Sequence, residues 1–167
     1  MLAPSVAAVE QAYDAAKYRR VPEAPALTIT VPSLADPSLA PDRRHTLSVT
    51  AHHVPFARSG RWDAVASEAL GDLVTNLVST VAPDLHERTM HRWVLTPADL
   101  EQRYGCTGGS LLHGELALDQ FLFMRPVPAC ARYSTPLAEF WLCGVGAHPA
   151  NSSGAGGMLA ARELAAR

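Results

Sequence analysis

The chain has 167 residues, 48% of them hydrophobic and 18% charged, with a formal net charge of −2. This composition is typical of a soluble globular protein and not of a disordered tail, and the charge gives no reason to expect nucleic acid or an anionic membrane as a partner. No apolar run approaches the ~18 residues of a membrane-spanning helix, so we expect no transmembrane segment.

The N-terminus and the cysteines indicate the compartment. The start Met1-Leu-Ala-Pro4 has no basic stretch followed by an apolar run, so we expect no signal peptide. Cys106, Cys130 and Cys143 are odd in number, widely spaced and form no CxxC pair. This pattern disfavours a disulfide framework or a zinc site and fits a reducing compartment. We therefore expect a cytoplasmic protein, which could also lie peripherally at a membrane.

The first half of the chain predicts two helices and at least two strands. Apolar residues at helical spacing predict an amphipathic helix over residues 5–19 and a long helix over residues 62–81. Residues 27–31 and 45–54 alternate apolar side chains with mostly hydroxyl-bearing ones, as half-buried strands do, and these two strands could pair antiparallel. Residues 89–95 could form a third strand.

A short helix is predicted to begin directly after that third strand. Thr96 is a suitable N-cap, Pro97 fits the first helical position, and Asp99 can return a hydrogen bond to the cap. Gly105 can end this helix in the left-handed region, where a side chain would cost energy.

The last thirty residues carry the strongest site signal. Residues 140–143 predict a short buried strand, residues 144–149 a glycine-rich turn, and residues 158–167 a helix. Glycines let the backbone approach a ligand closely, and a helix N-terminus presents free N–H groups with a partial positive charge. A plain glycine turn that closes a sheet has the same appearance, so both interpretations remain open here.

The same segment contains no complete dinucleotide-binding motif. Two glycine pairs could begin a GxGxxG sequence, but Pro149 and Leu159 occupy the positions of the third glycine. Neither pair lies in a full βαβ unit with a later acidic residue. The chain alone therefore lacks the turn that would hold the diphosphate of a dinucleotide.

Several other polar residues have two open interpretations. His52 and His53 face opposite sides of a predicted strand, which favours structural roles over a shared metal. His113 and Glu115 could form an acid–base pair, although hydrogen bonds that tie a loop are the simpler account. Arg125 lies among apolar residues, where it could pair with a buried acid or carbonyl or contact a ligand.

Six stretches, in order along the chain, resemble the C-terminal portion of phytoene-desaturase-like FAD oxidoreductases. The resemblance is to the branch of pyridine nucleotide-disulfide oxidoreductase domain proteins, in the flavin amine oxidase superfamily. The stretches are Val31-Pro-Ser33 with Asp36-Pro-Ser-Leu-Ala-Pro41, Leu95-Thr-Pro-Ala-Asp-Leu100, Gly109-Ser-Leu-Leu-His-Gly-Glu-Leu116, Met124-Arg-Pro-Val-Pro128, Tyr133-Ser-Thr-Pro136 and Trp141-Leu-Cys-Gly-Val-Gly-Ala-His-Pro149. In one place the chain departs from the family: relatives usually carry a glycine run after His-Pro, whereas Ala150-Asn-Ser-Ser153 stands here.

The resemblance implies a mixed fold, α/β to α+β. Residues 1–95 would form part of a substrate-binding domain built on an antiparallel sheet with helices. Residues 96–167 would form the C-terminal part of the FAD-binding domain. The N-terminal Rossmann unit of the family has no counterpart in this sequence.

The resemblance also implies a cofactor, a reaction and a partner. In the complete enzyme FAD would take a hydride from an apolar small-molecule substrate, and the missing N-terminal FAD-binding half, or a split-gene partner, would hold most of the cofactor. We expect FAD to bind weakly or not at all to this chain alone. Catalytic residues are unknown, and no metal is expected. The implied flavin-facing residues are Gly144, Val145, Gly146, His148, Pro149, Gly154, Ala155, Gly156, Gly157 and Met158.

A non-enzymatic interpretation remains beside this one. The chain could be a stand-alone remnant or an interaction module that binds a partner chain or an apolar ligand, and it could form a homo-oligomer. The sequence leaves open the substrate, the electron acceptor and the choice between a truncated gene, a split enzyme and an independent protein.

Overall fold

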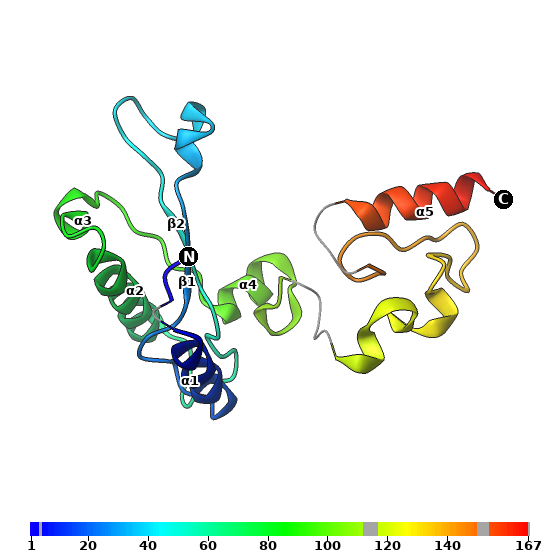
Figure 1. Cartoon of the computed structure of the whole chain (residues 1–167), viewed down its shortest axis with the longest axis horizontal. Helices are drawn as coiled ribbons and strands as arrows, with labels where there is room; N and C mark the ends of the chain where they lie inside the picture. The colour runs from blue at the N-terminus through cyan, green and yellow to red at the C-terminus, as the bar shows by residue number, and fades with distance from the viewer. Residues whose placement is uncertain (4, 112–116, 150–153, 167) are drawn as a thin grey trace. The chain divides into compact units, whose positions relative to one another are not determined.

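A computed structural model describes residues 1–3, 5–111, 117–149 and 154–166. The chain divides into two compact units, an N-terminal unit, Met1–Leu100, and a C-terminal unit, Glu101–Arg167. The described residues form a mixed fold of helices with one small antiparallel sheet of two strands (Figure 1). None of the described helices has the length and apolar character needed to cross a membrane.

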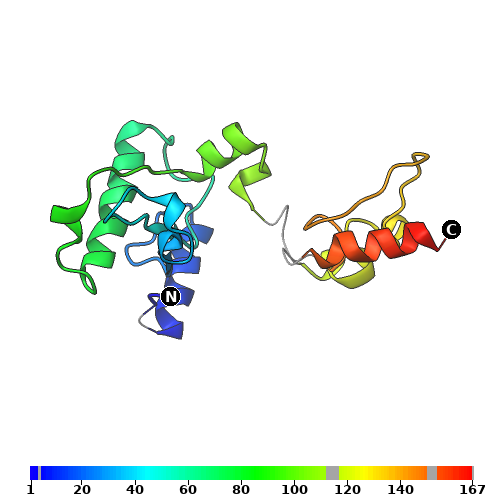
Figure 2. The ribbon, with the colours of Figure 1, turned by 90° about the horizontal axis from the view of Figure 1, so that it is seen from above.

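The N-terminal unit combines the predicted amphipathic helix with the predicted strand pair. Helix α1, Val6–Lys17, begins at Ser5, whose hydroxyl accepts a hydrogen bond from the Ala8 amide at 3.1 Å. Strands β1, Leu27–Thr30, and β2, Ser48–Ala51, pair antiparallel. A two-stranded sheet is marginal by itself, so it depends on the helices beside it in Figures 1 and 2.

The register of the two strands separates an apolar face from a hydroxyl face. The first face carries Leu27 opposite Ala51 and Ile29 opposite Val49, all of them buried or half-buried. The other face carries the pairs Thr28 with Thr50 and Thr30 with Ser48, all exposed. The alternation predicted from the sequence is therefore confirmed.

The long helix α2, Ala64–Ser79, begins at Asp63, whose carboxylate accepts a hydrogen bond from the Ala66 amide at 2.8 Å. Its inward side chains Leu70 and Val78 are buried, which confirms the predicted apolar stripe. A short helix α3, Leu85–Arg88, follows.

Two of the predicted strands are wrong. Residues 89–95 are irregular, with Trp93 66% exposed, and they run on into helix α4, Pro97–Tyr104. Residues 140–143 form no strand either; Trp141 makes one isolated bridge with Ser134, and Phe140 is 52% exposed. Neither segment has a neighbouring strand in the described residues to complete its hydrogen bonds.

The predicted start of α4 is confirmed in atomic detail. The Asp99 amide donates to the Thr96 hydroxyl at 3.2 Å, and the Thr96 amide and hydroxyl donate to the Asp99 carboxylate at 2.8 and 2.6 Å. Gly105 follows the helix in the left-handed region, at φ 68°. The boundary between the two compact units, after Leu100, falls inside α4.

The C-terminal unit consists of short turns around one long helix, α5, Ala155–Ala165. In the described part of this unit four 3-10 helices precede it, at Thr107–Gly109, Leu118–Gln120, Leu122–Met124 and Pro128–Cys130. Tyr133, Ala147 and Ala160 form the small buried core, with Trp141, Leu142 and Leu159 packed against it. The apolar residues that were predicted as a buried strand thus partly line this core from irregular backbone.

Candidate functional site

The predicted site residues lie on two adjoining elements of the C-terminal unit. The first is a turn over residues 144–149, called the glycine turn below, and the second is the first part of α5. The helix begins at Ala155 and not near Met158 as predicted, so three of the predicted loop residues are helical: Ala155, Gly156 and Gly157. The stretch from Ala150 to Ser153, where the sequence departs from the resembling family, lies outside the described residues, as do His113 and Glu115.

The glycine turn is fixed by its own backbone and by the core. Gly144 adopts φ 96°, a left-handed conformation that favours glycine, and its carbonyl accepts a hydrogen bond from the Ala147 amide at 3.2 Å. Ala147 is only 1% exposed and packs with Tyr133 and Ala160. The middle of the turn is therefore held by burial of a small apolar side chain.

Gly156 brings α5 into direct backbone contact with this turn. A Cβ placed on Gly156 would lie 3.1 Å from the Gly144 nitrogen, 3.2 Å from the Gly144 oxygen and 3.6 Å from the His148 oxygen. Only glycine permits this approach without displacing the backbone. The sequence predicted that Gly156 leaves space for a ligand. In the structure the backbone of the glycine turn occupies the place that a side chain at position 156 would take.

Gly146 and Gly157 have the opposite environment. A Cβ on either residue would meet no heavy atom of the described residues within 4 Å, and neither residue has a positive φ. The protein could therefore carry a side chain at both positions without strain. Open glycines beside a packed one form the kind of edge that an outside group can approach.

The N-cap residue of α5, Gly154, has no side chain with which to cap the helix. Gly154 is the N-cap residue at φ 79°, and its carbonyl accepts from the Met158 amide at 3.1 Å. The first turn of a helix carries N–H groups without intrahelical partners and a partial positive charge. An anion or a polar ring edge is the kind of group that such an end binds.

Arg125 contacts the glycine turn from another part of the chain. Its side chain is buried, with the residue 2% exposed, and Nε donates a hydrogen bond to the Val145 carbonyl at 3.0 Å. The prediction was that Arg125 pairs with a buried acid or carbonyl; the structure shows a carbonyl partner, and Val145 is half-buried. Direct contact with a ligand stays a prediction.

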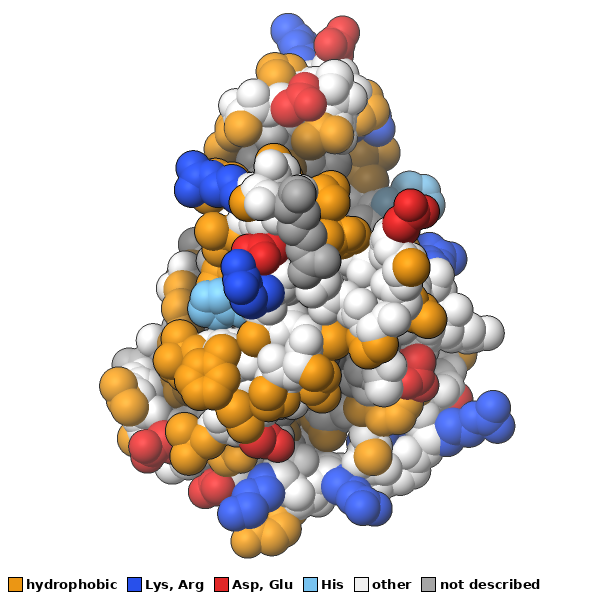
Figure 3. Space-filling view, turned by 90° about the vertical axis from the view of Figure 1, so that its right-hand side faces the viewer, with side chains coloured by type: hydrophobic (Ala, Val, Ile, Leu, Met, Phe, Trp, Pro, Cys, Tyr) orange, Lys and Arg blue, Asp and Glu red, His pale blue; other side chains and the backbone are white. Residues whose placement is uncertain are grey.

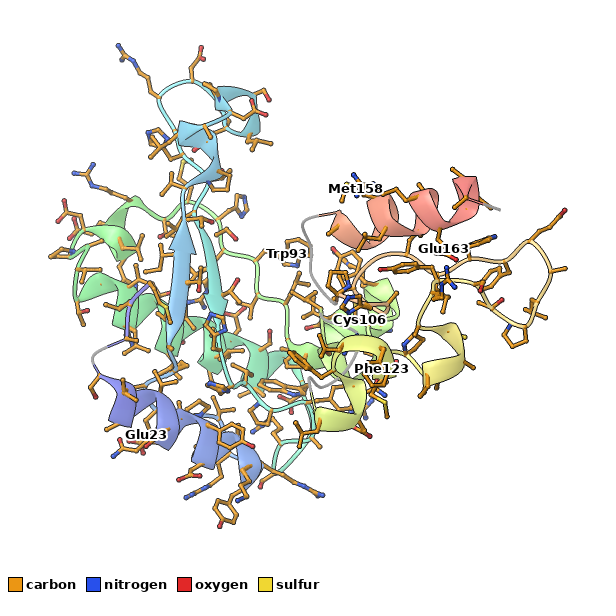
Figure 4. The ribbon with its side chains drawn as sticks, turned by 45° about the vertical axis from the view of Figure 1, so that its right-hand side comes forward. Glu23, Trp93, Cys106, Phe123, Met158 and Glu163 are labelled. Carbon is orange, nitrogen blue, oxygen red and sulfur yellow. The ribbon has the colours of Figure 1, made fainter. Side chains whose placement is uncertain are left out.

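Tyr133 is a buried tyrosine of the same unit whose hydroxyl is affected by the charge of Glu163. Burial raises the pKa of the Tyr133 hydroxyl above its ordinary value, and the negative charge of Glu163 adds to the rise. Glu163 itself forms an ion pair with Arg132 at 2.9 Å. Figure 4 labels Glu163 and Met158 on α5; Met158 is 50% exposed, whereas the Glu163 side chain is 20% exposed.

His52 and His53 have different partners, as their adjacent positions on a strand predicted. His52 Nε2 lies 2.8 Å from the Thr28 hydroxyl, and the His53 ring packs edge-on against Tyr13 with ring centres 5.7 Å apart. The two side chains have separate structural partners. In the described part of the chain no group of three His, Cys, Asp or Glu side chains could hold a metal ion.

The N-terminal unit contains an open, mainly apolar pocket of about 320 Å³. Trp62 forms one wall, and its indole nitrogen donates to the carbonyls of Pro55 and Phe56 at 3.3 and 3.1 Å. Ala66, Ala69 and Leu73 of α2 line it further. This volume is at the lower end of small-molecule sites.

Sequence comparison relates the chain to pyridine nucleotide-disulfide oxidoreductase domain-containing proteins and to two desaturases. It is 36% identical over 156 residues to pyridine nucleotide-disulfide oxidoreductase domain-containing protein 2 of Rattus norvegicus, covering 92% of this chain and 27% of the rat protein. It is 29% identical over 105 residues to carotenoid 3,4-desaturase of Haloarcula japonica, covering 63% of this chain and 21% of the relative. It is 28% identical over 135 residues to 4,4'-diapophytoene desaturase of Staphylococcus haemolyticus, covering 78% of this chain and 26% of the relative.

The chain is therefore a homologue of part of these proteins and spans about a quarter of their length. No family model matches the sequence, and no solved structure matches the chain. The family resemblance stated from the six stretches is confirmed.

Two contacts at the site were not foreseen from the sequence. Gly156 and Gly144 are twelve residues apart, and Arg125 and Val145 are twenty apart. The presence of Arg125 in an apolar stretch was the only signal for either contact.

Proposed function

We propose that this chain is the C-terminal part of a FAD-dependent oxidoreductase of the phytoene desaturase type. The observation that carries the proposal is the match to 27% of the rat protein over 92% of this chain, together with the matches to two desaturases. Residues 1–95 contribute to substrate binding, and residues 96–167 complete the flavin domain. Another polypeptide segment holds the dinucleotide part of FAD, because this chain has no GxGxxG turn.

The geometry of the glycine turn fits the flavin end of the cofactor. Gly146 and Gly157 leave an edge without side chains, where the backbone can lie against a flat ring. The first turn of α5, which begins after Gly154, favours negative charge beside it. When bound, FAD accepts a hydride from the substrate; the role of this chain is to orient the ring and to favour its reduced, more negative form. No residue of this chain is assigned a catalytic role.

An apolar substrate fits the N-terminal unit. The names of two relatives specify carotenoid and diapophytoene desaturases, which supports an apolar substrate class. The mainly apolar pocket beside Trp62 is a candidate place for part of such a molecule.

A chimaera tests the proposal with the whole chain. The segment of the rat protein that matches this chain is replaced by residues 1–167, and the purified chimaera is compared with the intact rat protein and with the rat protein lacking the segment. We expect the chimaera and the intact protein to show the visible absorbance of oxidised flavin and the deleted protein to lack it. If the intact protein is yellow and the folded chimaera is colourless, the chain is a remnant or a separate interaction module.

Two substitutions in the chimaera locate the flavin. Gly157→Leu and Gly146→Leu place bulk at the open edge, where the added Cβ meets no described atom within 4 Å, so we expect flavin occupancy to fall at least tenfold while the melting behaviour of the protein is kept. Ala161→Leu is the matched control, because it adds the same side chain at an exposed position of the same helix. Gly156→Leu is unsuitable, since its side chain would strike the Gly144 backbone and disturb folding. Equal flavin content in all three variants would place the flavin elsewhere.

A further inference from the structure

The pocket beside Trp62 has an apolar lining along one side of a helix. The residues of α2 that contribute to it have the spacing of neighbours on one helix face: Ala66, Ala69, Leu70 and Leu73. This stripe extends over about 10 Å of the helix axis. Val21 and Pro22, which follow α1 in the chain, line the pocket as well. A long, narrow apolar lining of this kind fits an unbranched hydrocarbon chain.

Arg58 brings a positive charge to this pocket. Its guanidinium carbon lies 5.1 Å from the centre of the Trp62 ring, and Nη1 donates a hydrogen bond to the Arg61 carbonyl. These two contacts hold the charged group beside the apolar lining. Within the described residues Arg58 forms no ion pair and no other hydrogen bond. A guanidinium has five N–H donors, so most of them are available to a ligand.

The charges around this guanidinium are mainly positive. The Ser59 amide donates to the Arg19 carbonyl at 2.8 Å, so two segments that are distant in sequence lie side by side. Residues 17–23 and 58–63 together carry five Lys or Arg and two Asp or Glu, a net charge of +3 in a chain whose formal net charge is −2. Glu23, labelled in Figure 4, also lines the pocket, but it is exposed, so water and salt screen its charge. The surroundings of the pocket therefore favour an anion.

We propose that this pocket binds a free carboxylic acid with an unbranched apolar chain. The chain lies along α2, and the carboxylate binds the guanidinium of Arg58. A guanidinium presents parallel N–H groups that match the two oxygens of a carboxylate. A neutral hydrocarbon would leave this charge without a partner. The inference rests on the proposed use of the pocket for an apolar molecule, and it does not require this chain to bind flavin.

Two probes of equal chain length separate the charged end from the apolar chain. Octanoate carries a carboxylate at neutral pH, whereas 1-octanol is uncharged. Their affinities for the purified chain are measured by NMR titration at low salt, below the concentrations at which either probe aggregates. We expect octanoate to bind about fivefold more tightly than 1-octanol. Added salt should reduce this difference, because salt screens a partly exposed charge. Equal affinity for the two probes at low salt overturns the proposal.

Substitutions of Arg58 test the charged contact. Arg58→Gln should weaken octanoate binding about fivefold and leave 1-octanol binding unchanged, whereas Arg58→Lys should weaken octanoate less than twofold. Arg61→Gln is the matched control, because it removes an exposed cation of the same segment that does not line the pocket and keeps the carbonyl that Arg58 contacts. An equal loss in Arg58→Gln and Arg61→Gln overturns the specific contact. If Arg58→Gln does not fold, the comparison of the two probes in the parent chain decides.

A substitution on α2 tests the apolar contact. Ala69→Leu fills part of the pocket from an exposed position, so both probes should bind at least fivefold more weakly. Ala64→Leu, at an exposed position of the same helix outside the pocket lining, should change neither affinity. Circular dichroism checks that both variants fold. Unchanged binding in Ala69→Leu places the chain of the ligand elsewhere and overturns the proposal.

A membrane surface is the alternative occupant. Vesicles of phosphatidylcholine with phosphatidylglycerol present anionic head groups, and binding to them without binding to dissolved octanoate overturns the proposal. Failure to bind octanoate at all also overturns it, while a flavin-containing chimaera would leave the proposed function standing. A colourless chimaera, in turn, overturns the proposed function in an experiment that does not involve octanoate.

Discussion

Gly71 lies inside α2, at a position where a helix ordinarily favours alanine. A Cβ there would stand 2.7 Å from Cγ2 of Val94 and 2.9 Å from Cζ of Arg92. The absent side chain lets the Arg92 guanidinium lie across the helix, where it forms ion pairs with Glu68 and with Asp72 at 2.5 and 2.7 Å. These two carboxylates raise the pKa of Arg92, the hydrogen bond to Asp72 most strongly.

We predict that Gly71→Ala destabilises the protein. Higher helix propensity would contribute about 1 kcal/mol in favour of alanine. Overpacking costs about 1–3 kcal/mol, and displacement of Arg92 weakens two partly exposed ion pairs worth a few tenths of a kcal/mol each. The net loss should be about 1 kcal/mol in chemical unfolding.

A double-mutant cycle with Val94→Ala checks the cause of this loss. Truncating Val94 removes the nearest atom, so Gly71→Ala should cost less in that background than in the wild-type chain. A stabilising effect of Gly71→Ala in the wild-type chain would contradict the argument.

At the level of elements, helices were predictable wherever the sequence carried both a period and a cap. The Thr96–Asp99 cap and the Asp63 start of α2 are local patterns, and local hydrogen bonds suffice to form them. The start of α5 was missed by three residues because glycines at 156 and 157 are poor helix formers, and contact with the glycine turn overrides that preference.

Strands were less predictable because they need partners. Residues 27–30 and 48–51 alternate apolar with polar side chains, and the two strands pair with each other. The apolar run at 140–143 has no neighbouring strand in the described residues. The candidate site was found from its glycines, but which glycine packs and which stays open depends on contacts between residues far apart in sequence. Spacing along the chain carries no such information.

The two adjacent glycines of α5 give a matched prediction. Gly156→Ala should lower the melting temperature, because its Cβ would lie 3.1 Å from backbone that cannot move aside easily. Gly157→Ala should leave it unchanged or raise it, since the new methyl group meets no atom of the described part of the chain within 4 Å and helix propensity improves by up to about 1 kcal/mol. Thermal unfolding followed by circular dichroism distinguishes the two, and equal shifts would refute the close contact of Gly156 with Gly144.

On the scale of the whole molecule, many large apolar side chains remain exposed. Figure 3 shows hydrophobic side chains across the face that it presents. One stretch of the C-terminal unit, Leu118 to Val127, carries five of them with at least half of their surface exposed: Leu118, Phe121, Leu122, Phe123 and Val127. Contiguous exposed apolar surface in a folded protein usually marks a place of contact with another polypeptide.

We predict that the purified chain associates with itself through this stretch as its concentration rises. Phe121→Ser with Phe123→Ser should shift the sedimentation profile towards the monomer. Leu34→Ser with Leu39→Ser, at exposed positions of the N-terminal unit, is the matched control and should leave association unchanged. A chain that stays monomeric at every concentration would remove the reason to regard the stretch as a contact surface.

Three contacts that hold the glycine turn lower the entropy cost of binding to it. Arg125, the buried Ala147 and the backbone at Gly156 all belong to this chain, so the turn is ordered before anything binds to it. Ordering a flexible backbone costs about 1–2 kcal/mol per residue. Binding of a partner or ligand to residues 144–149 therefore does not include the cost of ordering the turn. We expect it to resemble rigid docking more than folding upon binding.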